Sequence, residues 1–203
     1  LSGVIRGGFT GVDNGREGAV IINGRHGSYA VHADMYKRTA EDYRTPDGKQ
    51  RNSSLEMQGY AFGTSYIFDS GYIGAAISHF GSLYHVPGGE AEDRKVRIDL
   101  AQTKFTSKGE IRVNSAFIDT IRFWFGAGSY RHHEIADEGA GPEIKSTFRN
   151  RQYEGRVEVQ FLPVKTAMGD WKSALGLQFS RRNIGTAGEA GELLSPARET
   201  HLA

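Results

Sequence analysis

Residues 155–161 read Gly-Arg-Val-Glu-Val-Gln-Phe, with an apolar side chain at every second position from Val157 onward. A side-chain period of two is typical of a β-strand with one apolar face and one polar face. The same alternation recurs along the chain and is clear at 73–78, 96–101 and 175–180. The pattern therefore predicts an all-β protein, and no segment requires a helix.

The alternation predicts about ten strands that pair antiparallel in chain order, so the expected fold is an all-β antiparallel meander. The tight connection at Asp69–Gly71 has the residue types that a hairpin turn needs. The predicted strands are residues 2–11, 17–25, 28–40, 56–68, 71–83, 94–113, 118–133, 146–163, 170–184 and 197–203.

The connections between these strands are predicted to be of two kinds. The tight ones are residues 24–27, 68–71, 114–118 and 163–170, and the long ones are residues 41–55, 84–93, 134–145 and 185–196. Short turns at one end and long loops at the other are typical of a large transmembrane β-barrel. In such a barrel nine apolar side chains are expected to face lipid: Ile73, Ile77, Val96, Ile98, Leu100, Val157, Val159, Leu175 and Leu177.

Composition excludes several classes of protein. No apolar run is long enough for a transmembrane helix, although the mean hydropathy of −0.49 is compatible with a barrel, in which only alternate residues face lipid. The net charge of +1 gives no electrostatic argument for a nucleic-acid partner, and the absence of cysteine excludes disulfides and thiolate sites. Because the chain begins at Leu1 without a signal peptide, we expect an internal piece of a longer precursor.

Aromatic residues gather near the two kinds of connection. One set, near the tight turns, is Tyr66, Phe68, Tyr72, Phe117, Phe161 and Trp171; the other, near the long loops, is Phe80, Tyr84, Tyr130, Phe148 and Tyr153. Two such belts predict the aromatic girdles of a membrane barrel. Four charged residues, Arg97, Asp99, Arg156 and Glu158, are expected on the inward face, where they line a polar lumen or pair across strands.

Several stretches resemble TonB-dependent outer-membrane receptors, and the similarity extends over nearly the whole chain. One of them, 83–88 followed by 96–103, resembles the zinc- and haem-type branch of that family. The stretches are Leu1–Phe9, Tyr29–Arg38 with Asp42-Tyr43, Phe68–Gly74, Leu83–Gly88, Val96–Thr103, Phe148–Asn150 and Tyr153–Arg156.

The resemblance implies a bacterial outer-membrane barrel of about 22 strands closed around an N-terminal plug. Such a receptor takes up a scarce ligand (zinc, an iron chelate, a siderophore or haem) with energy passed through TonB. Residues 1–203 would be the first strands of that barrel, without the plug, the TonB box or the C-terminal strands. The implied partners are outer-membrane lipid, the TonB complex through the missing plug region, and a small-molecule or metal ligand.

Histidines and carboxylates near the long loops are candidate ligand-binding residues at the outer rim. Imidazole with carboxylate suits zinc and similar metals, although the spacing matches no compact metal motif. Solvated loop side chains are the alternative interpretation. The candidate metal ligands are His85, His132, His133, Glu90, Glu92 and Asp93.

No catalytic residue and no resident cofactor is expected, because the chain has no nucleophile elbow, phosphate loop or HExxH motif. Two other functions remain open. One is a passive porin-type channel, which has no plug. The other is a soluble all-β binding or structural module, in which the apolar face would pack against a second sheet.

Overall fold

The computed structural model describes residues 1–203, with the side chain of Leu193 excepted. Strands make up 74% of the chain, and the two helices, α1 (Gly89–Asp93) and α2 (Glu189–Leu193), have five residues each, so the fold is all-β. Ten long strands are β1 (Ser2–Thr10), β2 (Gly15–His26), β3 (Tyr29–Ala40), β6 (Leu55–Phe68), β7 (Gly71–His85), β8 (Arg97–Arg112), β9 (Ile118–Asp137), β10 (Pro142–Phe161), β13 (Ala174–Gly188) and β14 (Ala197–Leu202). Four short strands form two small hairpins: β4 (Arg44–Thr45) with β5 (Gly48–Lys49), and β11 (Val164–Thr166) with β12 (Gly169–Trp171).

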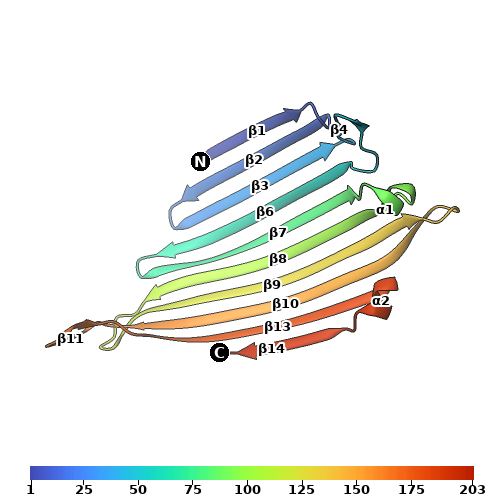
Figure 1. Cartoon of the computed structure of the whole chain (residues 1–203). Coiled ribbons are helices and arrows are strands. Elements are labelled where there is room, and N and C mark those ends of the chain that lie inside the picture. Colours follow the sequence, from blue (N-terminus) through green and yellow to red (C-terminus); the bar gives the residue numbers. More distant parts are fainter.

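The ten long strands form one antiparallel sheet in which each strand pairs with the next long strand along the chain, as Figure 1 shows. The predicted meander is therefore confirmed. Strands β1 and β14 are the two edges and do not pair with each other, so the sheet is open. Both chain termini lie at the end of the sheet that carries the two-residue turns (Figure 1).

Two predicted connections differ from the structure. The expected loop 134–145 is mostly strand, because β9 continues to Asp137, β10 begins at Pro142, and only residues 138–141 form the turn. The polar residues of this segment show no apolar alternation, because a hairpin that projects into water needs no apolar face. The expected tight turn 163–170 is instead the β11–β12 hairpin, which projects from the end of the sheet that carries the two-residue turns and the chain termini (Figure 1).

Register shows which side chains share a face, because paired residues of adjacent strands point the same way. Val157 pairs with Leu177 and with Phe123, and the ladder continues through Gly109 to Ile73. We call this face the convex face and the opposite one the concave face. Six of the nine apolar residues predicted to face outward share the convex face: Ile73, Ile77, Val157, Val159, Leu175 and Leu177.

The prediction for the start of β8 is wrong. Ile98 pairs with Glu134 and lies on the concave face together with Leu100, while Val96 precedes the strand. The convex positions of this segment are Arg97 and Asp99, which were expected to point inward. The cause is a change of polarity along the sheet: near the long loops the convex face becomes polar and the concave face becomes apolar.

The sheet is a single layer. Apart from α2, which rests on β10 and β13, every substantial contact joins strands that are neighbours in a sheet. Only Ile98, Ala136 and Ala190 are buried apolar residues among the described side chains. The accessible surface is 13840 Å², whereas a compact protein of this mass exposes about 9,400 Å². No second sheet therefore covers the convex face in the described chain.

Candidate functional site

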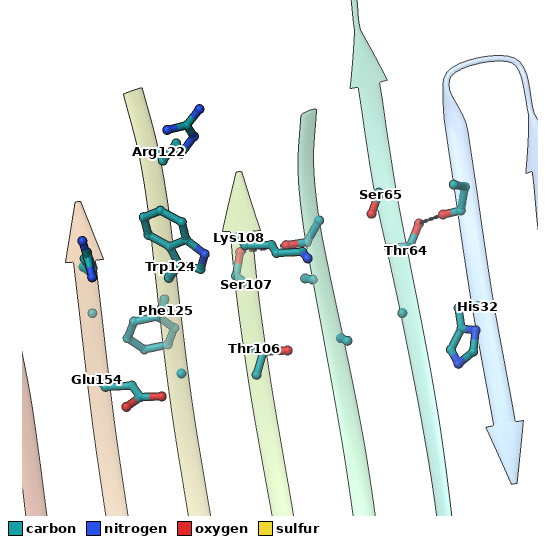
Figure 2. Close-up of a pocket in the computed structure, with 18 of the residues that line it drawn as sticks. His32, Thr64, Ser65, Thr106, Ser107, Lys108, Arg122, Trp124, Phe125 and Glu154 are labelled. Atoms are coloured by element: carbon teal, nitrogen blue, oxygen red, sulfur yellow. Dashed lines mark hydrogen bonds between the residues drawn. The ribbon is translucent and has the colours of Figure 1, made fainter. Parts of the chain in front are cut away.

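The concave face holds a broad hollow of about 1200 Å³ at the same level as the apolar band of the convex face. Figure 2 shows polar side chains from successive strands that line it, among them His32, Ser65, Lys108, Arg122 and Glu154. The curvature of the sheet toward this face creates the hollow, and the strands hold each side chain at a set depth.

Small residues keep the floor of the hollow open. Gly63, Gly74 and Gly126 occupy concave positions where a larger residue would fill the space. A Cβ atom at Gly74 would lie 2.5 Å from Ser65 Oγ, and one at Gly63 would lie 3.2 Å from the Ala76 Cβ. The alternation of strands with small and large side chains thus shapes a cavity rather than a packed layer.

An ion-pair network crosses three strands beside the hollow. Arg122 Nε donates to Glu110 Oε2 at 2.7 Å, and Arg156 Nη2 donates to Glu158 Oε2 at 2.7 Å. Arg122 also lies 3.5 Å from Glu158, which links the two pairs. The guanidinium of Arg156 stands 5.6 Å from the centre of the Trp124 ring. Arg156 and Glu158 thus share the concave face, as predicted; they pair with each other along β10, and Glu158 also pairs across the strands with Arg122.

An aromatic cluster lies on the concave face nearer the long loops, and we call it the aromatic shelf. Its rings are Tyr36, Phe80, Tyr84, Tyr130, His132 and Phe148. Tyr36 stacks on Phe80 with ring centres 6.5 Å apart, and His132 stacks on Phe148 at 4.4 Å. The Tyr130 hydroxyl forms a 2.7 Å hydrogen bond with His132 Nδ1. The shelf offers planar surfaces and a phenol to an organic ligand.

The sequence prediction assigned four of these aromatic residues, Phe80, Tyr84, Tyr130 and Phe148, to an outer girdle. That assignment is wrong, because they lie on the concave face; Tyr153 alone of its set lies on the convex face. Whether a residue number is odd or even determines the face within one strand, so the sequence did contain the information needed to place these rings. In β7 the convex residues Ile73 and Ile77 are odd-numbered, so Phe80 must point the other way.

The connections at the loop end are joined into one rim. Asn52, at a positive φ of 55°, donates its side-chain amide to the carbonyl oxygens of Val86 at 2.7 Å and Val96 at 2.9 Å. Arg51 Nε donates to Glu92 Oε1 at 2.7 Å. These contacts connect the segment 41–54 with the segment 86–96, which contains α1.

Glu138 extends the rim to the β9–β10 turn. It accepts hydrogen bonds from Lys145, at 3.1 Å, and from Arg94, and these hold the pKa of the Glu138 carboxyl below its usual range. A hydrogen bond from Arg51 likewise lowers the pKa of Glu92. Both carboxyls are therefore ionised at neutral pH, and the rim depends on charge.

The predicted metal ligands are not gathered in one place. His132 and His133 are neighbours in β9 and point to opposite faces; His133 bonds to Thr147 Oγ1 at 2.8 Å on the convex face. His85 bonds to Ser54 near the rim. Glu92 forms an ion pair with Arg51, and Glu90 and Asp93 are exposed. Among the described residues no three histidine, aspartate or glutamate side chains are grouped so as to hold a metal ion.

Comparisons with models of known families and with curated proteins found no match for this chain. Within the described residues, neither of the helices has the length and apolar character needed to cross a bilayer.

Proposed function

We propose that this chain forms part of the wall of an outer-membrane receptor, which takes up a scarce ligand with energy delivered through TonB. The observation that supports this proposal most strongly is the band of apolar side chains on the convex face. On β10 the convex positions are apolar from Tyr153 to Val159 and change to arginine at Arg151. Six steps of about 3.3 Å give about 20 Å along the strand, which at a tilt of about 40° is about 15 Å along the membrane normal, more than half of the roughly 25 Å lipid-facing band of membrane barrels.

The same band crosses neighbouring strands at the same level. It includes Phe105 and Ile111 in β8, Phe123 and Phe125 in β9, and Leu175, Leu177 and Phe179 in β13. Leu175 is 67% exposed and Leu177 is 59% exposed, so water would contact them if nothing else covered the face. Burial in lipid removes this unfavourable exposure. A soluble module with this surface would aggregate.

The concave face supports transport rather than mere anchoring. Its hollow and ion-pair network suit a lumen that is filled by water or by another polar segment, and the aromatic shelf lies between that lumen and the loop rim. Rings that stack favour an organic ligand, such as a siderophore or haem. The histidines are scattered among the described residues, so they support a bare zinc ion as the ligand less well than the rings support an organic one.

Single cysteines test the membrane placement cleanly, because the natural chain contains none. Arg156→Cys, Val157→Cys and Glu158→Cys would each carry a nitroxide label in the protein reconstituted in bilayers. We expect oxygen to relax the label at position 157 and a water-soluble nickel chelate to relax those at 156 and 158. Equal access of the nickel chelate to all three would reject the lipid-facing band.

Energy dependence separates a receptor from a passive porin. Iron-starved cells that produce the protein are supplied with haem or a ferric siderophore, with and without TonB. A receptor supports growth only when TonB is present. Growth that continues equally without TonB would favour the porin.

A further inference from the structure

Four arginines, which we call the arginine cluster, lie on the convex face at the border of the apolar band nearest the long loops. They come from three adjacent strands: Arg131 from β9, Arg149 and Arg151 from β10, and Arg181 from β13. Toward the long loops, each lies two to four positions beyond the last apolar convex residue of its strand. Arg131 comes after Ala127 and Arg181 after Phe179 in the sequence. Arg149 and Arg151 come before Tyr153, because β10 runs in the opposite direction. The cluster therefore marks the level at which the face changes from apolar to charged.

The register places like charges side by side. Arg149 pairs directly with Arg131, and Arg151 follows Arg149 on the same face of the same strand. Arg181 pairs with Tyr153 and so lies diagonally across from Arg151. Like charges directly opposite each other on adjacent strands are destabilising. The register of the strands therefore holds several positive charges close together, and their repulsion is unfavourable.

Within the described part of the chain, no carboxylate relieves this repulsion. Among the side chains that the structure describes, none of the four arginines forms an ion pair, whereas Arg122 and Arg156, on the concave face of β9 and β10, both pair with Glu158. Moreover, the Nε atom of Arg181 is buried without a hydrogen-bond partner. A buried donor without an acceptor is unfavourable, so a group outside the chain that accepts from this donor would stabilise it.

We infer that the arginine cluster binds the phosphate groups of an anionic lipid of the outer leaflet, with the acyl chains of that lipid on the apolar band below. This inference rests on the proposed membrane location. Guanidinium groups bind phosphate bidentately, and several phosphate oxygens can bridge arginines that would otherwise repel one another. Continuity with the apolar residues Tyr153, Phe179 and Leu177 selects a lipid headgroup over a soluble anion, because one molecule then contacts both surfaces.

The test compares two triple variants of the protein in lipid nanodiscs. Arg131→Gln, Arg149→Gln and Arg151→Gln remove three charges of the cluster. The matched control, Arg6→Gln, Arg25→Gln and Arg182→Gln, removes three from the concave face. The probe is diphosphoryl lipid A in phosphatidylcholine discs, and the readouts are the lipid A retained per protein and the urea midpoint of unfolding.

Lipid A should raise the midpoint of the natural protein and of the control, and the cluster variant should lose this gain. The apparent affinity for lipid A should fall on the order of 100-fold for three arginines. In discs of phosphatidylcholine alone the cluster variant should be at least as stable as the natural protein, because like charges have been removed. That second measurement separates loss of a lipid site from loss of folding.

Three results would overturn the inference. The first is an undiminished gain in the cluster variant, and the second is an equal gain with lipid A stripped of its phosphates. The third is full competition by inorganic phosphate, which would identify a soluble anion as the ligand. If the natural protein does not insert into either type of disc, the proposed membrane location itself fails, and that outcome is distinct from insertion without a preference for lipid A.

Discussion

Replacement of Leu177 by arginine separates a lipid-facing sheet from a water-exposed one. Leu177 is the middle convex residue of β13 between Leu175 and Phe179, it pairs with Val157, and it is 59% exposed. Arginine at the midplane of a membrane barrel costs about 2–4 kcal/mol, which lowers the folding equilibrium constant about 30- to 900-fold. At an exposed position in water the same change is within about 0.5 kcal/mol of neutral.

The matched control is Gln178→Arg, one residue further along the same strand. Gln178 lines the concave hollow, so an added charge there contacts water or polar groups and should change stability by about 0.5 kcal/mol or less. Both variants are folded into phosphatidylcholine vesicles, and urea titrations are followed by the fluorescence of Trp124 and Trp171. Equal losses for the two variants would refute the assignment of the convex face to lipid.

Three further predictions concern the rim, the shelf and the hollow. The rim carboxyl Glu138 has a lowered pKa, so its stabilising effect is full above the ordinary value of 4.5 and is lost as the pH falls through the lower value in the folded state. Acid should therefore speed proteolysis of the loops, and Glu138→Gln should produce the same sensitivity at neutral pH. An unchanged cleavage rate would contradict the charged rim. His132→Ala should reduce ligand-limited growth by removing the ring that stacks on the shelf, while its neighbour His133→Ala should not, provided that surface expression is equal; equal effects would reject the shelf as the ligand surface. Gly74→Val should lower the free energy of unfolding by about 1–3 kcal/mol, because its Cβ meets Ser65 Oγ; Gly128→Val, with open space around it, should be nearly neutral in the same urea titrations, and similar losses for both would reject the steric argument.

The sequence alone determined the class and order of the fold. Alternation along 155–161 and 73–78 is a property of neighbouring residues, and hairpins pair segments that are close in the chain, so both can be read locally. Residue parity within one strand could also have placed Phe80 and Tyr130 on the face opposite Ile73 and Phe123. Distance from the turns, by contrast, does not determine the face on which an aromatic side chain lies.

Tertiary structure decided what depends on several strands at once. Arg131 and Arg149 become direct neighbours only through the register of β9 with β10, and neither strand alone indicates that like charges meet. The reversal of polarity near the loops, which turns Ile98 to the concave face, likewise requires the full ladder. The hollow exists because the small residues of separate strands, Gly63 and Gly126, lie over the same curved surface. Long-range register and curvature are collective properties of the sheet, and therefore no single segment encodes them.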